Sequence, residues 1–334
     1  MIASDYFWFR LFRTRGIGPK RLVKIQREME QNGLAPYALP RNKEMLQEQY
    51  PSLAKIILPA VRADDRDEIL GEYERLRAQG ISVVYPGHDD YPLTLIEDAE
   101  RFGVSPVLLC KGSTGILRKR SVAIVGSRHI ESRFGAKVAR QIAEDLARRG
   151  INVVSGYARG VDFEAHLGAL KAKGTTTAVL SYGILNYKAK ENLCSPDDQG
   201  SLERILVISQ FSPHEPWLAR NAMVRNKLVC ALSHALVVIE CGPERDAETG
   251  RMSGTFHAAL TALEMGRPLF VLSPDSLGRS LEGNKELIRR GGKPMDPAEA
   301  ADKIIEALER QVNGKTGVAF RVGGDVLRQG RLFA

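Results

Sequence analysis

Three glycine-containing segments, at 126–129, 155–160 and 253–255, bear groups suited to binding an anion. The first two directly follow apolar runs that predict β-strands, and the third follows such a run after the polar insertion at 243–252. Each segment carries a hydroxyl group, and the first two also carry Arg128 and Arg159. Glycine lets backbone N–H groups approach a phosphate, a helix N-terminus favours negative charge, and arginine donates two parallel hydrogen bonds. One such loop fits a plain strand-to-helix turn equally well, but three at one sheet edge favour anion binding.

The spacing of these segments differs from that of a dinucleotide site, which needs G-x-G-x-x-G after the first strand and an acid about 20 residues on. Here the first loop reads Gly126-Ser127-Arg128, and the second strand ends at Ser155-Gly156 without the acid. NAD is therefore not expected. Gly314-Lys315-Thr316 resembles the end of a P-loop, but Glu309 stands where the first glycine of that motif belongs, so no P-loop is expected either.

No metal-binding or catalytic constellation accompanies the loops. The four cysteines form no C-x-x-C pair, the six histidines are isolated, and G-x-S-x-G is absent. Asp162, Glu164 and Glu240 are the carboxylates nearest the expected site. Asp162 is expected to cap a helix and His166 to be a structural hydrogen-bonding residue. We expect no metal, no cofactor and no catalytic residue.

The elements around the loops predict an α/β fold. Short apolar runs predict strands at 81–84, 107–110, 122–125, 152–154, 177–180, 205–209, 235–239 and 268–272. Helical periods lie between most of them, and a last helix is expected at about 297–312. Strands that alternate with helices indicate a doubly wound, mainly parallel sheet, whose ligands sit at the carboxyl ends of the strands.

Residues 1–75 predict a small helical domain of the SAM or helix-hairpin-helix type, before a Rossmann-like α/β domain at 76–312 and a tail at 313–334. Gly16-Ile17-Gly18-Pro19 separates two amphipathic runs and resembles a helix-hairpin-helix turn, with seven cations and no acid around it. Its backbone N–H groups could face a DNA phosphate. A plain turn in a docking domain fits as well.

Composition limits the function further. The 334 residues are 26% charged and 43% hydrophobic, with a net charge of +8, which permits a polyanionic partner without proving one. No apolar run approaches the ~18 residues of a membrane span, and the N-terminus does not read as a signal peptide. We expect a soluble, cytoplasmic protein without disulfide bonds.

The distribution of basic and aromatic residues suits the binding of a nucleic-acid strand but does not by itself identify the anion. Cations neutralise the phosphates of a strand and flat rings stack on its bases. Basic residues occupy the loops, a later helix start at 220–227, and positions 118–120. Phe134, Tyr157 and Trp217 are aromatic neighbours, although packing in the core is an alternative for Phe134 and Trp217.

The order of these motifs resembles that of the DprA/Smf (DNA-processing) family. The matching stretches are Val125-Gly126-Ser127-Arg128, Ser132-Arg133-Phe134-Gly135, Ser155-Gly156-Tyr157-Ala158-Arg159-Gly160-Val161-Asp162, Arg225-Asn226-Lys227-Leu228-Val229, Ser253-Gly254-Thr255 and Gly283-Asn284. Arg15-Gly16-Ile17-Gly18-Pro19 and Asp90-Tyr91-Pro92 fit as well, so that the resemblance covers roughly 5–295.

The resemblance implies an extended Rossmann-like domain that binds single-stranded DNA without catalysis. It also implies a homodimer that protects incoming DNA and helps load RecA recombinase during natural transformation. The nucleic-acid-binding residues expected on this basis are Gly126, Ser127, Arg128, Arg133, Gly156, Arg159, Gly160, Trp217, Arg220, Asn221, Arg225, Asn226, Lys227, Ser253, Gly254 and Thr255. Arg128, Arg159 and Lys227 are expected to line one pocket, with Gly126, Gly156 and Gly254 as its floor.

The chain departs from the family pattern in four places. Tyr187-Lys188 stands where the family usually has tyrosine-proline, and a polar insertion occupies 243–252. Arg-Asn occurs twice, as Arg220-Asn221 and Arg225-Asn226, so which pair lines the groove stays open. The C-terminal winged-helix domain of many members is not expected here.

Two other functions stay open from the sequence. Related Rossmann-like families that hydrolyse nucleotide N-glycosidic bonds place a glutamate on the helix after the glycine turn, but residues 253–258 contain none. A nucleotide-binding sensor in a defence or signalling system is the other alternative. Separately, Gln329-Gly330-Arg331-Leu332-Phe333 resembles the peptide by which bacterial proteins dock onto the sliding clamp, although a tail folded onto its own domain fits too.

Overall fold

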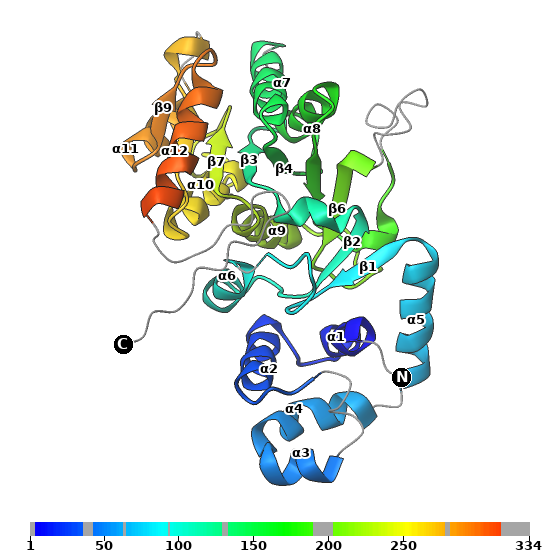
Figure 1. Cartoon of the computed structure of the whole chain (residues 1–334). Helices are drawn as coiled ribbons and strands as arrows, with labels where there is room; N and C mark the ends of the chain where they lie inside the picture. Colours follow the sequence, from blue (N-terminus) through cyan, green and yellow to red (C-terminus); the bar gives the residue numbers. More distant parts are fainter. Residues whose placement is uncertain are drawn as a thin grey trace.

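The computed structural model describes residues 4–35, 43–62, 65–92, 94–128, 133–189, 203–277 and 281–314. Its centre is a nine-stranded sheet in the order β1-β2-β6-β5-β4-β3-β7-β8-β9 (Figure 1). The strands are β1 Ile81–Val84, β2 Leu108–Gly112, β3 Ser121–Val125, β4 Asn152–Gly156, β5 Thr176–Val179, β6 Ile205–Ser209, β7 Ala235–Val238, β8 Leu269–Leu272 and β9 Lys293–Met295.

The sheet is parallel from β6 to β9, and β1 and β2 extend it antiparallel beyond β6. From the central β3 the chain proceeds through β4 and β5 to β6 on one side, and later through β7 and β8 to β9 on the other. The direction of winding therefore reverses between β3 and β7, where an open α/β sheet forms its ligand crevice. The expected doubly wound, mainly parallel α/β fold is confirmed.

Helices cover both faces of the sheet. The helices are α1 Ser4–Arg13, α2 Pro19–Gln31, α3 Lys43–Gln49, α4 Pro51–Arg62, α5 Arg66–Ala78, α6 Thr94–Phe102, α7 Arg133–Arg148, α8 Val161–Lys171, α9 Ala219–Ala231, α10 Gly254–Glu264, α11 Glu282–Arg289 and α12 Ala300–Gly314. Short 3-10 turns lie at Thr114–Arg118, Ile184–Asn186 and Asp275–Leu277. Among the described residues, no helix combines the length and apolar character needed to cross a bilayer.

Alternate residues of each strand enter different cores, as the pleat of a strand requires. Val122 and Ile124 of β3 pack with α7, α8 and α12 on one face, whereas Ala123 and Val125 pack with α9 and α10 on the other. Because both faces are buried, the strands are largely apolar runs, interrupted by a few buried Ser, Thr and Asn residues, which is why most of them were predictable from the sequence. The three-residue β9 was not predicted, because two of its residues are exposed.

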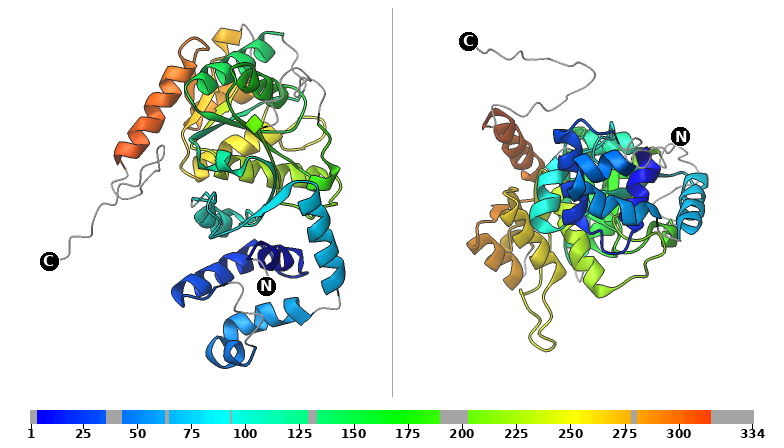
Figure 2. Two further views of the ribbon diagram at one scale, coloured as in Figure 1. Left: turned by 45° about the vertical axis from the view of Figure 1, so that its right-hand side comes forward. Right: turned by 90° about the horizontal axis from the view of Figure 1, so that it is seen from below.

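The N-terminal helices share a core with one end of the sheet. Trp8 and Phe9 of α1, both fully buried, belong to the same apolar cluster as Ile81, Val83 and residues of β2, β5 and β6. These helices gather at one end of the molecule below β1 and β2 (Figures 1 and 2). The domain limit expected at residue 75 falls inside α5, and the limit expected at 312 falls inside α12.

Candidate nucleic-acid interface

Backbone hydrogen bonds join the loops that follow three neighbouring strands. The Ser127 N–H after β3 donates to the Glu240 carbonyl after β7 (2.9 Å), and the Val161 N–H at the start of α8 donates to the Ser127 carbonyl (3.2 Å). Gly160 has φ +78°, and a β-carbon there would overlap the Ser127 carbonyl. The loops after β3, β4 and β7 therefore meet at one edge of the sheet, as the sequence predicted.

Two further glycines allow this close packing. A β-carbon at Gly126 would lie 2.5 Å from a methyl group of Val161, and one at Gly135 would overlap the buried carboxylate of Glu240. The start of α8 thus packs against the loop after β3, and the start of α7 packs against the residue that follows β7. Gly135 and Glu240 support the site from below, a role that the sequence analysis did not assign to them.

Exposed cations and rings stand above this framework. The guanidinium of Arg128 lies 5.9 Å from the centre of the Trp217 ring, within the range of a cation–π contact. Trp217 is 53% exposed and Phe134 45%, so the alternative that these two rings pack in the core is wrong. Arg159 and Arg220 are also exposed, and no ion pair involves either of them in the part of the chain that the structure describes.

Arg225 lies beneath this surface. Its side chain, 6% exposed, reaches from α9 under the loop after β4, where its Nη1 donates to the Val179 carbonyl (3.1 Å) and stands 3.8 Å from Asp162 Oδ2. A β-carbon at Gly156 would overlap the same nitrogen. Arg225 was expected among the DNA-binding residues, but the structure buries it, because Gly156 leaves room for a guanidinium inside the fold.

Asp162 is a buried ion-pair partner and not the helix cap that the sequence analysis expected. Burial raises the pKa of its carboxyl group, and the positive charge of Arg225 opposes that rise. The residue at the N-cap position of α8 is Gly160, which has no side chain with which to cap the helix. His166 is the structural hydrogen-bonding residue that was expected: its ring nitrogens contact the Gly156 carbonyl (2.8 Å) and Thr176 Oγ1 (2.7 Å).

The remaining polar residues of α9 are largely turned toward the protein. Asn226 donates to the Gly254 carbonyl (2.9 Å), and the ammonium of Lys227 donates to the Phe102 carbonyl (3.2 Å). Asn221 is buried, with its amide nitrogen 3.5 Å from a carboxylate oxygen of Glu215. Of the two Arg-Asn pairs, only Arg220-Asn221 has an exposed arginine. Lys227, expected in one pocket with Arg128 and Arg159, instead faces α6.

The third glycine segment forms the start of α10. The Ser253 hydroxyl accepts a hydrogen bond from the Phe256 N–H (3.3 Å) and so caps the helix, while Gly254 is exposed and Thr255 half-buried. The insertion at 243–252 is closed by a bridge between Arg245 and Met252 and projects from the body of the molecule (Figure 2). A salt bridge of 2.6 Å between Glu244 and Arg290 ties its base to the end of α11.

Arg133 and the tyrosine at 187 were also singled out from the sequence. Arg133 begins α7, but its side chain lies outside the described part of the chain. Tyr157 is half-buried against Tyr187, with ring centres 5.4 Å apart. Tyr187, which Lys188 follows where the family usually has proline, therefore still brings a ring to this edge. Within the described ranges, no group of three or more His, Cys, Asp or Glu residues could hold a metal ion.

Comparison with known proteins gives consistent similarities. A family model described as DNA recombination-mediator protein A matches residues 82–309. The DNA processing protein DprA of Bacillus subtilis is 30% identical over 237 residues, which are 71% of this chain and 74% of that protein. Protein Smf of Escherichia coli is 33% identical over 223 residues, 66% of this chain and 54% of that protein. An X-ray structure of DprA from Streptococcus pneumoniae superposes with a TM-score of 0.67 at 24% identity, covering 91% of this chain and 98% of that one.

Proposed function

The chain belongs to the DNA recombination-mediator protein A family, and we propose that it binds single-stranded DNA at the carboxyl edge of its sheet. In this proposal the strand runs over Arg128, Arg159, Arg220 and Trp217. Loops that carry glycines bring backbone N–H groups close to its phosphates. The role that follows from binding is that of a recombination mediator which protects incoming DNA during natural transformation.

The contact between Arg128 and Trp217 is the observation that supports the proposal best. The guanidinium can bind a phosphate and the exposed indole beside it can stack on a base, and the two are close enough together to contact the same nucleotide. Such a pair suits a strand whose bases are free to stack. Bases inside a duplex are already stacked on one another, so we expect preference for single strands.

We propose binding without catalysis. The Asp162 carboxylate is buried against Arg225, and Glu240 lies buried beneath the start of α7, so neither is an exposed acid or base. At the helix start where a nucleotide hydrolase would carry its glutamate, α10 begins Gly254-Thr255-Phe256-His257. These features support a site that holds a strand and does not cut it.

The partners we propose are those of a mediator: single-stranded DNA, a RecA-type recombinase that receives the strand, and a second copy of the chain in a homodimer. The proposed setting is the cytoplasm. A sliding clamp is a further proposed partner through Gln329–Phe333, which lie outside the described residues. A pull-down with the clamp, comparing the full chain with one ending at Gln329, tests that contact.

Fluorescence anisotropy tests the proposed function directly. Labelled single-stranded DNA, duplex DNA and free nucleotides are titrated with the protein at one salt concentration, and unlabelled nucleotides compete with the bound strand. We expect the single strand to bind most tightly and mononucleotides to compete weakly. Tighter binding of a free nucleotide would favour a sensor, and release of free base from nucleotides on incubation would overturn the proposal of binding without catalysis.

A further inference from the structure

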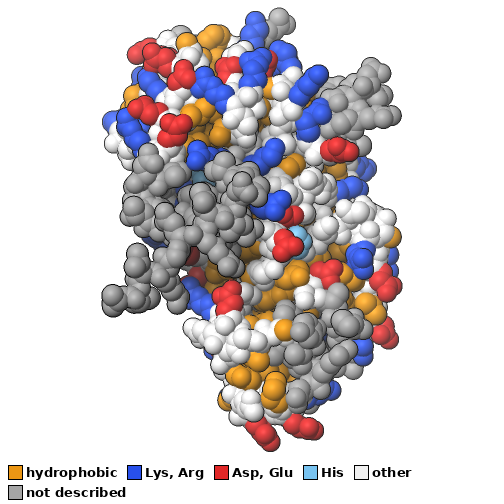
Figure 3. All heavy atoms as spheres, viewed as in Figure 1, with side chains coloured by type: hydrophobic (Ala, Val, Ile, Leu, Met, Phe, Trp, Pro, Cys, Tyr) orange, Lys and Arg blue, Asp and Glu red, His pale blue; other side chains and the backbone are white. Residues whose placement is uncertain are grey.

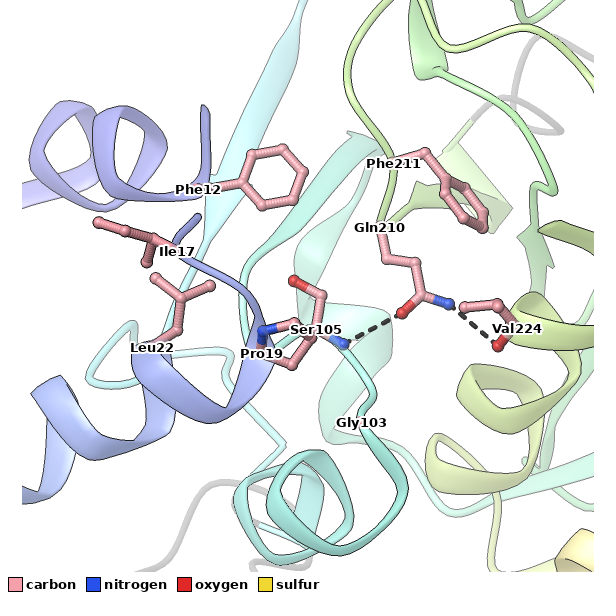
Figure 4. Close-up of a pocket in the computed structure, with 9 residues that line it drawn as sticks. All are labelled: Phe12, Ile17, Pro19, Leu22, Gly103, Ser105, Gln210, Phe211 and Val224. Atoms are coloured by element: carbon pink, nitrogen blue, oxygen red, sulfur yellow. Dashed lines mark hydrogen bonds between the residues drawn. The ribbon is translucent and has the colours of Figure 1, made fainter. Parts of the chain in front are cut away.

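We propose that a cavity between the turn after α1 and the carboxyl end of β6 binds a nucleobase of the strand held at the sheet edge. This inference rests on the proposed function and extends the path of the strand toward the N-terminal helices. The cavity has a volume of about 140 Å³. Its lining residues are Phe12, Ile17, Pro19, Leu22, Gly103, Ser105, Gln210, Phe211 and Val224 (Figure 4).

The walls of the cavity are apolar and include two rings. Phe12 comes from α1 and Phe211 from the segment after β6, and both are half-buried. Val224 of α9 is 37% exposed, so the cavity has a side that faces solvent. In Figure 3, hydrophobic side chains gather on the surface where the N-terminal helices meet the sheet.

Polar contacts fix the two sides of the cavity relative to each other. Arg13 of α1 donates to the Ser212 hydroxyl (2.9 Å), next to Phe211, and pairs with Glu72 of α5 (2.6 Å). Arg27 of α2 donates to Glu100 of α6 (2.9 Å). The cavity is therefore braced before any ligand arrives, which lowers the entropic cost of filling it.

The polar groups of the lining are already used within the protein. Gln210 accepts from the Ser105 N–H (3.1 Å) through its side-chain oxygen and donates to the Val224 carbonyl (3.2 Å), as drawn in Figure 4. The Ser105 hydroxyl donates to the Val107 carbonyl (2.8 Å). An occupant would therefore be held by its flat apolar surface and not by hydrogen bonds to the edge of a base. Such a site accepts any base, as a sequence-tolerant stacking platform does.

The cavity lies next to the proposed DNA site and is surrounded by exposed cations. These two features favour a nucleobase of the bound strand as its occupant, and not an apolar side chain of another protein. Arg220 and Val224 lie four residues apart on the exposed side of α9, which puts the cavity about 6 Å along the helix from a cation of the proposed site. Arg15 and Lys20, beside Ile17 and Pro19 of the lining, are exposed, and no ion pair involves them among the described residues. A strand that leaves Arg220 thus meets an apolar cavity and then further cations for its phosphates.

Blocking the cavity tests the proposal. Val224→Trp fills the cavity from its solvent side, and Phe211→Leu removes one ring while keeping an apolar group. Gln47→Trp, at an exposed position of α3, is the matched control. Affinities are measured by anisotropy with a thymidine oligomer and with the same oligomer carrying one abasic position, moved stepwise along the strand.

In the wild type we expect one abasic position near an end of the bound stretch to weaken binding about tenfold, the scale of one stacked base. In Val224→Trp and Phe211→Leu, the penalty at that position should shrink to near onefold, while Gln47→Trp keeps it. An unchanged penalty in both folded variants would overturn the proposal, even if Arg128→Ala abolishes binding. If the wild type fails to bind single strands at all, the proposed function itself fails.

Photocrosslinking gives a readout that does not depend on any variant. An oligomer with 5-iododeoxyuridine at the position found by the abasic scan is irradiated with the wild-type protein, and the linked peptide is identified by mass spectrometry. We expect the link at Phe12 or Phe211. Crosslinks confined to Trp217 and the loops of the sheet edge would show that the base lies elsewhere and would refute the cavity assignment.

Discussion

The guanidinium of Arg225 fills the space that a β-carbon of residue 156 would occupy, so the two residues are packed directly against each other. Arg225 in turn bonds the carbonyl of Val179 and faces Asp162. The loop after β4, the end of β5 and helix α9 are thereby locked together beneath the exposed Arg128. The proposed DNA surface depends on a buried cation that would not itself touch DNA.

Gly156→Ala should destabilise the fold, because the methyl group displaces the guanidinium in a closely packed region. We expect a loss of about 1–3 kcal/mol in the free energy of unfolding, the usual cost of overpacking. Gly254→Ala is the control, since the nearest atom to its added methyl group is 3.7 Å away and the position is exposed. Urea denaturation of both variants checks this. Equal stability of the two would contradict the packing described here.

Removal of Arg225 should make stability depend on pH. Arg225→Met removes the largest of the effects that oppose burial at Asp162 and leaves the hydrogen bonds from Ser155 and Ala158 and the charge of Arg128. The pKa of this carboxyl group in the folded state therefore rises further above its unfolded value of about 3.9. A folded state with the higher pKa binds more protons than the unfolded state. Its stability is therefore greatest at low pH and falls as the pH rises above about 4 and through the folded-state pKa.

The measurement is the difference in unfolding free energy between the wild type and Arg225→Met, by urea denaturation from pH 4.5 to 7.5. We expect the deficit of the variant to grow with pH toward about 3–5 kcal/mol, the cost of leaving one charge of a buried pair alone. In the double variant Asp162→Asn/Arg225→Met the growth should disappear. A deficit that stays constant with pH would mean that Asp162 is not the group left unpaired.

The sequence predicted the elements of this site more reliably than the directions of its side chains. Strand β6, Ile205–Ser209, was predicted to the residue, because a fully buried strand is a nearly continuous apolar run and here only the last residue is polar. Arg225 and Arg220 have the same chemistry and lie five residues apart, and only the space above Gly156 determines that one is buried. That space is created by packing between segments that are distant in the sequence. A local sequence pattern therefore cannot predict it.

The same reason explains Asp162 and the cavity. An aspartate in the first turn of a helix usually caps it, but here a buried arginine 63 positions away competes for the carboxylate. The cavity joins Phe12 to Phe211 and Val224 across the N-terminal helices and the sheet. Hydrophobic periodicity predicts that such residues belong to apolar faces. It does not show where two apolar faces leave a cavity between them.

Arg128→Ala should weaken binding of single-stranded DNA without changing the stability of the fold. The lost charge-assisted contact is expected to cost about 1–3 kcal/mol. The slope of log affinity against log salt should flatten by about 0.7, the share of one phosphate contact on a single strand. Arg128→Lys should restore part of the slope but not the full affinity, since the bidentate fork is lost.

Lys119→Ala is the matched control for Arg128→Ala. It removes the same single positive charge from an exposed position just before β3. Lys119 belongs to the basic run at 118–120 that supported a nucleic-acid partner from the sequence, but the structure puts it at the opposite end of β3 from Arg128. Its salt slope should equal that of the wild type. If the two variants flatten the slope equally, binding follows net charge alone, and Arg128 has no place in a defined site.

Trp217 should report binding through its own fluorescence. The chain has two tryptophans, of which Trp8 is fully buried among the N-terminal helices and Trp217 is 53% exposed. Stacking of a base on the exposed indole should quench the emission as single-stranded DNA is added.

Trp217→Phe should abolish that change while keeping most of the affinity, because the phenyl ring still stacks, whereas Trp217→Ala should lose about 1–3 kcal/mol of binding. Because the ring is exposed, both variants should unfold at the wild-type temperature. Quenching of wild-type size in Trp217→Phe would assign the change to Trp8, which lies one helical turn before Phe12 on α1, and would show that no base stacks on Trp217.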